Sequence, residues 1–128
     1  MRCVIVDDSA DFVDAAVRML ESQGITVIGS AATGSQARRD VEELRPDVVL
    51  VDVNLGSESG FEVVEQLHYE ARSTPPRMIL ISTEAEDDMA DMIAASAAVG
   101  FLSKATLSAN AIDDLLGGRD DSDGQTLR

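Results

Sequence analysis

Five short apolar runs recur along the chain, and the longer segments between them carry apolar residues at helical spacing. The runs are residues 3–6, 25–28, 48–51, 78–81 and 99–102. Because apolar and polar residues do not alternate within them, they are typical of strands that are buried on both faces of a parallel sheet. The second run is the most mixed, with Thr26 inside it and Gly29 and Ser30 after it, so we expect it at an edge of the sheet.

The intervening segments predict five helices. We expect them at about residues 12–20, 35–44, 61–71, 86–98 and 109–116, with Gly24 closing the first and Ser108 capping the last. Acidic residues open the fourth segment, where the helix dipole favours them. Strict alternation of strand and helix predicts an α/β domain with a parallel sheet covered by helices on both faces.

Composition and charge narrow the function classes. A chain of 128 residues is about one domain, and its 3% aromatic content means that aliphatic side chains must build the core. The formal net charge of −14 argues against nucleic acid as a direct partner, since phosphate neutralisation requires clustered Lys and Arg. The charge fits a protein that attracts divalent cations or basic surfaces.

Two further features concern location and domain limits. The single cysteine, Cys3, lies in the first apolar run and is expected to be a buried small hydrophobe. The chain opens directly into a strand and has no run of membrane-spanning length, so we expect a cytoplasmic protein without a signal peptide or membrane contact. Residues 118–128 are charged and aperiodic; we expect a domain over 1–117 and then a disordered tail or the start of a linker.

Polar side chains that can take part in binding or catalysis follow four of the five predicted strands. They are Asp7 and Asp8 after the first, Asp52 after the third, Ser82 and Thr83 after the fourth, and Lys104 after the fifth. Because the carboxyl ends of parallel strands lie along one edge, these residues are expected to converge there. Three neighbouring carboxylates raise one another's pKa unless a cation bridges them, and their oxygen ligands favour Mg²⁺. Cys and His clusters for zinc are lacking.

This arrangement predicts phosphoryl chemistry. A carboxylate beside Mg²⁺ can attack phosphorus to form an acyl phosphate, and Asp52 is the expected nucleophile. The three remaining phosphoryl oxygens would then be met by Mg²⁺, the Ser82 hydroxyl and the Lys104 ammonium. Taken singly, the aspartates and Ser82 could be helix caps or turn residues and Lys104 a surface lysine; their joint position favours the functional interpretation.

The sequence resembles a known family over residues 1–117. The motifs are Val6-Asp7-Asp8, Val51-Asp52-Val53-Asn54, Gly60, Ile81-Ser82 and Ser103-Lys104, and in this order they resemble the receiver domain of two-component response regulators. The resemblance implies a flavodoxin-like (βα)5 doubly wound sheet with strand order 2-1-3-4-5. It also implies a phosphoprotein that is not an enzyme with a separate substrate, although it has self-phosphorylation and autodephosphorylation activity.

The same resemblance implies the roles of individual residues. Asp52 would be the phospho-acceptor, Lys104 the phosphate-binding lysine and Ser82 the switch hydroxyl. Mg²⁺ would be bound directly by Asp52, by Asp8 and by the Asn54 carbonyl, and through water by Asp7. Phe101 would be the aromatic residue whose rotation follows Ser82, and it belongs to the core in any case. Polar residues at Asn54 and Glu84 go with faster hydrolysis in this family, so a short-lived phosphoryl group is expected.

Partners follow from the resemblance too. A histidine kinase or another phosphotransfer protein would phosphorylate Asp52, and the Ala-rich face of the fourth helix, fifth strand and fifth helix would control an output protein, or form a homodimer. Residues 27–34 resemble receivers of NarL/LuxR-type regulators, which are often followed by a DNA-binding domain. A stand-alone receiver and the receiver half of a transcriptional regulator both remain open, and the kinase and stimulus cannot be told from the sequence.

Two positions depart from the family pattern. Gly56 stands where proline is frequent, which predicts a more mobile loop after Asp52. Ala105 stands where a proline with a cis bond is common, and because a cis bond to alanine costs about 3–4 kcal/mol we expect a trans Lys104–Ala105 peptide.

Two other functions are alternatives to the receiver interpretation. Phosphatases of the haloacid dehalogenase type also form an aspartyl phosphate on a parallel sheet, but their first strand ends in an Asp-x-Asp motif, whereas this chain has Asp7-Asp8. The other rival is an interaction domain that works without phosphorylation.

Overall fold

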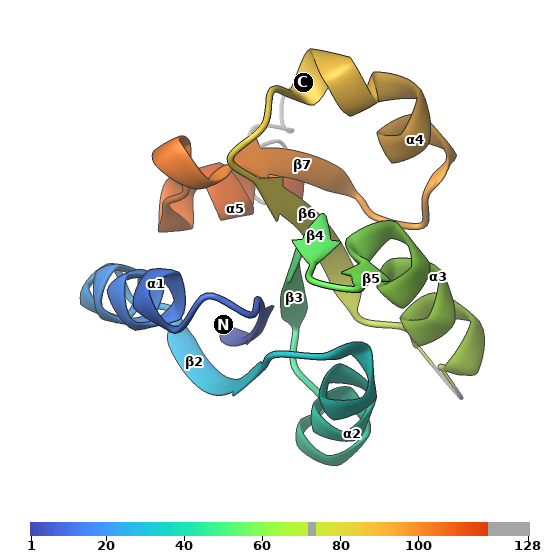
Figure 1. Cartoon of the computed structure of the whole chain (residues 1–128). Coiled ribbons are helices and arrows are strands. Elements are labelled where there is room, and N and C mark those ends of the chain that lie inside the picture. The colour runs from blue at the N-terminus through green and yellow to red at the C-terminus, as the bar shows by residue number, and fades with distance from the viewer. Residues whose placement is uncertain (72–73, 118–128) are drawn as a thin grey trace, which may run out of the picture.

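The computed structural model describes residues 1–71 and 74–117, so the predicted tail at 118–128 lies outside the described residues. One parallel sheet is formed by β1 (Arg2–Val6), β2 (Thr26–Ala31), β3 (Val48–Asp52), β6 (Arg77–Ser82) and β7 (Gly100–Ser103). Its order is β2-β1-β3-β6-β7 (Figure 1). Counted along the chain this is the predicted order 2-1-3-4-5, and the mixed second run forms an edge strand as expected.

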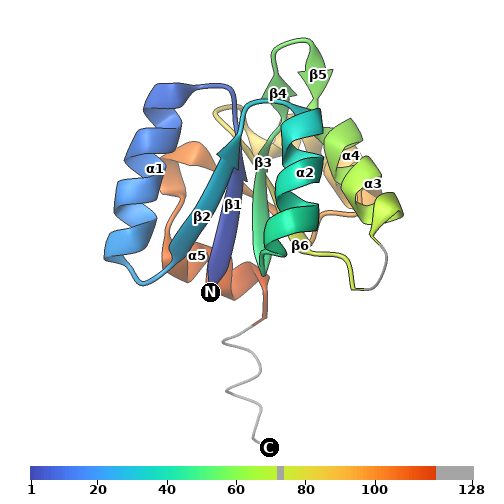
Figure 2. The same cartoon turned by 90° about the horizontal axis from the view of Figure 1, so that it is seen from below.

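Helices cover both faces of the sheet. They are α1 (Ala10–Ser22), α2 (Gly34–Leu44), α3 (Gly60–Glu70), α4 (Ala90–Ala95) and α5 (Ala109–Leu115), with short 3₁₀ helices η1 (Glu86–Met89) and η2 (Lys104–Thr106). Helices α1 and α5 lie on one face and α2, α3 and α4 on the other (Figures 1 and 2). Within the described ranges, no helix has the length and apolar character needed to cross a membrane.

The core is divided by the sheet into two apolar clusters. Val4, Val49 and Leu80 point to the face covered by α2, α3 and α4, while Ile5 and Leu50 point to the face of α1 and α5. All of these side chains are fully buried, since successive residues of a strand face opposite sides and both sides are covered. This burial on both faces explains why the strand sequences are continuously apolar. Cys3 is buried as predicted, and burial raises the pKa of its thiol to about 12.

Hydroxyl side chains begin four of the helices. Ser9, Thr33, Ser59 and Ser108 each accept a hydrogen bond from a backbone amide in the first turn of α1, α2, α3 and α5 respectively. Gly24 follows α1 with a φ of 94°, the left-handed conformation that ends helices and that glycine adopts without steric cost. The first and last helix limits were therefore readable from the sequence.

The fourth helix is shorter than the predicted 86–98. Its first residues form the 3₁₀ helix η1, and α4 ends at Ala95. The Ser96 hydroxyl donates to the carbonyl of Ile93 and accepts from the amide of Ala98, which replaces the helical pattern of hydrogen bonds. The Ala97 amide donates to the Glu65 carboxylate of α3 at 2.7 Å. A tertiary contact therefore ends this helix, and single-sequence periodicity does not reveal it.

The connection from β3 to α3 is held close to the sheet. It contains two short antiparallel strands, β4 (Asn54–Leu55) and β5 (Glu58–Ser59), which stand above the carboxyl edge of the sheet (Figure 2). The Gly60 amide donates to the Val53 carbonyl at 2.7 Å, and a Cβ atom at Gly60 would collide with the backbone carbonyl of Asp52. Glycine is therefore required where α3 approaches the end of β3.

We predict that Gly60→Ala destabilises the protein by about 2–3 kcal/mol, because the new methyl group must push rigid backbone apart. The measurement is the free energy of unfolding from urea denaturation.

Gly34→Ala is the matched control for this prediction, since Gly34 is likewise the first residue of a helix. Its added Cβ would meet mainly the carboxylate end of Glu58, at 2.8 Å, and that flexible side chain can move. Equal losses in the two variants would contradict the role given to Gly60.

Candidate functional site

The carboxyl edge of the sheet gathers three carboxylates. Strands β1 and β3 are neighbours with Val6 opposite Val51, so the residues that follow, Asp7 and Asp52, come next to each other. Carboxylate oxygens of Asp7, Asp8 and Asp52 all lie within 4.8 Å of one another. The predicted convergence of these residues is therefore present, and it follows directly from the strand order.

Lys104 completes this acidic site. It follows β7 directly, and its Nζ lies 2.6 Å from Asp7 Oδ2 and 3.1 Å from Asp52 Oδ2. Its side chain is only 13% exposed, so the ammonium neutralises two carboxylates at a site with little water. One cation thereby bridges the ends of the first and third strands of the sheet.

Backbone amides hold the second oxygen of each carboxylate. Ser9 N donates to Asp7 Oδ1 at 2.9 Å, and Asn54 N donates to Asp52 Oδ1 at 3.2 Å. The other oxygen of Asp7, Oδ2, is buried and pairs with the Lys104 ammonium at 2.6 Å. A carboxylate oxygen has more than one lone pair, so it has capacity left for a further cation.

The electrostatics of the site are set by burial and by this ion pair. Burial raises the pKa of Asp52, and the nearby Asp7 charge adds to that, while the Asn54 amide and Lys104 oppose it without cancelling it. Burial on its own would lower the pKa of Lys104, but its contacts with Asp7 and Asp52 outweigh burial and the pKa is raised. Lys104 is therefore held charged, and the ionised form of Asp52 is disfavoured.

The residues present fit a divalent cation. Three carboxylates from two strand ends lie within reach of a single ion, while one ammonium, that of Lys104, contacts two of them. Hard divalent cations such as Mg²⁺ take oxygen ligands of this kind, and added positive charge would relieve the disfavoured ionisation of Asp52.

The remaining predicted site residues lie near this cluster, and Asn54 contacts it through its backbone amide, which donates to Asp52 Oδ1. Ser82 ends β6 next to β3, is buried, and accepts a hydrogen bond from the Glu84 amide at 2.9 Å. The Glu84 side chain is exposed, as are Thr83 and Asn54. Phe101 lies on β7 with its side chain buried among the residues beneath α3 and α4.

One residue of the site was not singled out from the sequence. Phe12 was expected only as part of the apolar face of the first helix, but the Lys104 ammonium lies 4.3 Å from the centre of its ring, as in a cation–π contact. The signal was an aromatic residue four positions after Asp8, in the first turn of the predicted helix. That position became informative only when β7 brought Lys104 over it.

The peptide after Lys104 was also predicted. The structure has no cis peptide bond among the described residues, so the Lys104–Ala105 bond is trans as expected. Gly56 has a φ of 70°, which is compatible with glycine and not with the proline frequent at that position. The predicted mobility of its loop stays a prediction.

Comparison with known proteins agrees with this fold and site. The model of the response regulator receiver domain family matches residues 3–115. A protein-glutamate methylesterase/protein-glutamine glutaminase of Geobacter sulfurreducens is 34% identical over 107 residues, which make up 83% of this chain and 28% of that protein. The transcriptional regulatory protein LiaR of Bacillus subtilis is 30% identical over 114 residues, 88% of this chain and 53% of LiaR.

Among solved structures, the signal receiver domain of the response regulator NarL from Mycobacterium tuberculosis has a TM-score of 0.77. It is 27% identical, and the match covers 94% of this chain and 96% of that one. The chain spans about 28% of the curated methylesterase it matches and about half of LiaR, so the match concerns one domain of each. On the family match across residues 3–115, this chain belongs to the response regulator receiver domains of two-component systems.

Proposed function

We propose that this receiver accepts a phosphoryl group on Asp52 and uses it to change a surface that an output partner reads. The single observation that carries the proposal is the buried cluster in which Lys104 contacts both Asp7 and Asp52, with Asp8 alongside. A surface salt bridge would not need two buried carboxylates with the exposed Asp8 beside them, whereas a phosphoryl acceptor needs a nucleophile with cations around it.

The chemistry assigned to Asp52 is a nucleophilic displacement. An Asp52 carboxylate oxygen forms a bond to phosphorus as the phosphorus–nitrogen bond of a phosphohistidine breaks, and the departing imidazole keeps the electron pair and is protonated. The Lys104 ammonium already touches Asp52 Oδ2 at 3.1 Å, so it is placed to neutralise the oxygens of the incoming group. The donor would be a histidine kinase or a phosphotransfer protein.

The acidic cluster would hold Mg²⁺ through Asp52, Asp8 and the Asn54 carbonyl, with Asp7 acting through water. Bound there, Mg²⁺ supplies positive charge that favours approach of the phosphoryl oxygens to Asp52. Three carboxylates against the one ammonium of Lys104 leave an excess of negative charge, which supports a cation at this place.

Ser82 and Phe101 are the residues proposed to transmit phosphorylation of Asp52 to the surface of the domain. In the structure Ser82 Oγ accepts from Glu84 N, and Phe101 is buried in the core. A phosphoryl oxygen at Asp52 would draw the Ser82 hydroxyl away from that amide, and the space released would let the Phe101 ring repack. Helix α4, strand β7 and helix α5 then carry the change to an output partner, or to a second receiver.

Several classes of output are compatible with this receiver. The relatives carry this region as one part of a methylesterase or of a transcriptional regulator, and both are longer than the match. A stand-alone receiver, a receiver fused to a DNA-binding domain, and an interaction domain independent of phosphorylation are separated by the experiments below and by the length of the native reading frame.

The first prediction from this proposal is that incubation with acetyl phosphate and MgCl₂ adds one phosphoryl group to wild type and none to Asp52→Asn. Intact-mass spectrometry measures the addition. Asp47→Asn, an exposed carboxyl at the opposite end of the same strand region, is the control and is expected to behave as wild type. Addition to Asp52→Asn would place the acceptor elsewhere, and no addition to any variant would favour the phosphorylation-independent alternative.

A second prediction concerns stability and pH. Because the folded-state pKa of Asp52 is raised, its contribution favours folding at low pH and is lost as the pH rises through that pKa. Asp52→Asn is therefore expected to be more stable than wild type at pH 7 without metal, and the difference is expected to shrink on acidification. Urea denaturation across this pH range measures both effects.

Addition of Mg²⁺ is expected to reverse this order. At ten times its dissociation constant, the ion stabilises wild type by about 1.4 kcal/mol, and Asp52→Asn by less. Asp14→Asn, an exposed carboxyl on α1, is the control for charge alone. A metal-free Asp52→Asn that is less stable than wild type at pH 7 would show that the Lys104 ion pair outweighs the burial of Asp52.

A third prediction concerns the phosphoryl lifetime. Glu84 and Asn54 are exposed beside the ends of β6 and β3, where polar side chains can guide an attacking water. Glu84→Leu is expected to slow dephosphorylation about tenfold, corresponding to about 1.4 kcal/mol in the barrier. Decay of the phosphorylated mass gives the rate, with Glu86→Leu as a control of equal charge; identical lifetimes in wild type and Glu84→Leu would rule out this role.

A further inference from the structure

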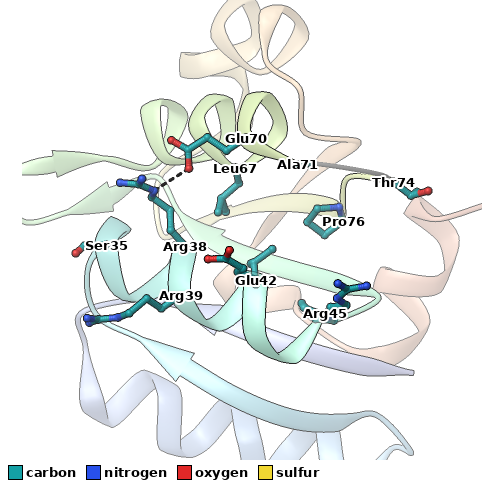
Figure 3. A pocket seen from close by; sticks show the side chains of 12 residues that line it. Ser35, Arg38, Arg39, Glu42, Arg45, Leu67, Glu70, Ala71, Thr74 and Pro76 are labelled. Atoms are coloured by element: carbon teal, nitrogen blue, oxygen red, sulfur yellow. Dashed lines mark hydrogen bonds and ion pairs between the residues drawn. The ribbon is translucent and has the colours of Figure 1, made fainter.

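A groove between α2 and α3 lies apart from the acidic site. Its volume is about 750 Å³, and residues of α2, of α3 and of the segments that lead into β3 and β6 line it (Figure 3). Pro46 precedes β3 and Pro76 precedes β6, so the groove extends to the amino edge of the sheet, opposite the edge that holds Asp52. Phosphoryl chemistry at Asp52 makes no use of it.

The floor of this groove is apolar. Val41 of α2 and Leu67 of α3 line it, and Pro46 and Pro76 lie at one end. Figure 3 shows the Leu67 side chain directed from α3 into the space above α2. An apolar side chain of a ligand would therefore find a matching surface between the two helices.

The rim is rich in arginine, although the chain as a whole is acidic. Arg38, Arg39 and Arg45 line the groove, which accounts for three of the ten Lys and Arg residues of a chain whose formal net charge is −14. Two carboxylates, of Glu42 and Glu70, also line it, so the groove keeps a net positive charge. Charge complementarity points to an anionic ligand.

Arg45 occupies a backbone conformation that favours glycine. It caps α2 with a φ of 49° and a ψ of 64°, and it is the only non-glycine residue of positive φ among those described. Glycine is the usual residue at such a helix end, and a larger residue there carries a conformational cost. In Figure 3 its side chain lies at the same end of the groove as Pro76, which places a positive charge at that end.

The ion pair at the other end is exchangeable. Arg38 Nε lies 2.8 Å from Glu70 Oε1, but the two side chains are 49% and 44% exposed, so the pair contributes little to stability. A carboxylate from a ligand could replace Glu70 at Arg38 with little loss. The groove thus has a cationic group at each end and an apolar floor between them.

The spacing of these cations sets the shape of the ligand. Arg38 and Arg45 are seven residues apart, which corresponds to about 10 Å along a helix. An extended peptide advances about 3.3 Å per residue and its alternate side chains share one face, so carboxylates four residues apart lie about 13 Å apart on that face and can reach the flexible arginine side chains at both ends. The apolar side chain between them would lie over Leu67.

We propose that the groove between α2 and α3 docks an extended segment of a partner protein in which two acidic residues, four positions apart, flank an apolar side chain midway between them. This docking surface is independent of the phosphoryl site, and its failure would leave the function proposed for Asp52 untouched.

The test titrates the isotopically labelled chain with the peptide acetyl-Asp-Ala-Leu-Ala-Asp-amide, whose two aspartates and leucine share one face when extended, at physiological salt and follows backbone amide shifts by NMR. Saturable shifts are expected in α2, α3 and the segments before β3 and β6. The same peptide with both aspartates replaced by asparagine is expected to bind at least about fivefold more weakly, the size of one exposed ion pair.

Two pairs of variants separate local from overall charge. Arg45→Gly is expected to weaken the peptide about fivefold without lowering the urea midpoint, because glycine suits the backbone there; Arg18→Ala, on the exposed side of α1, loses the same charge and is expected to bind as wild type. Arg39→Glu and Arg18→Glu repeat the comparison with a charge reversal.

Several outcomes would overturn the proposal. They are the absence of saturable shifts in α2 and α3, equal binding of the asparagine peptide, and equal weakening by the groove and the Arg18 variants. If sedimentation shows that Arg39→Glu abolishes a dimer while the peptide does not bind, the occupant is a second copy of this chain and the proposal of a peptide partner is wrong.

Discussion

The structure depends on the charge balance at the carboxyl edge of its sheet. Strand order places Asp7 beside Asp52, and a fold that did this without a cation would bury repelling carboxylates. Lys104 supplies this cation from the end of β7, an edge strand of the sheet, where its ammonium reaches both Asp7 and Asp52. Its contact with the Phe12 ring ties α1 to the same point. Elements from both ends of the chain therefore meet at one ion pair.

The same arrangement makes the site less stable than it could be. Burial raises the pKa of Asp52 even with Lys104 in contact, so at neutral pH the ionised carboxylate costs folding free energy. Gly60 lies so close to the backbone of Asp52 that its position admits no side chain. This is a second constraint on the sequence at the same place. A nucleophile with cations around it is obtained at the expense of stability, and the aliphatic clusters on the two faces of the sheet provide the compensation.

The sheet and the acidic cluster could be predicted because they depend on short-range pattern and on topology. Uninterrupted apolar runs give the strands, and parallel strands bring their carboxyl ends together, so Asp7, Asp52 and Lys104 follow without knowledge of any side-chain contact. The end of α4 could not be predicted, since Glu65 of another helix binds the Ala97 amide there. Phe12 was missed for the same reason, because its role arises from Lys104, 92 positions away along the sequence.

Helix α2 connects the two surfaces of the molecule physically. At its amino end, the Gly34 amide donates to the Glu58 carboxylate at 2.9 Å, and Glu58 belongs to the short strand pair that follows Asp52. At its carboxyl end stands Arg45, whose carbonyl accepts from Arg2 Nη1 at 2.8 Å. A packed helix moves as a unit, because its internal hydrogen bonds make it stiffer than the loops at its ends. Helix α2 therefore spans the distance between the strand pair at the acidic edge and the arginine-lined groove, and hydrogen bonds to other elements hold both of its ends.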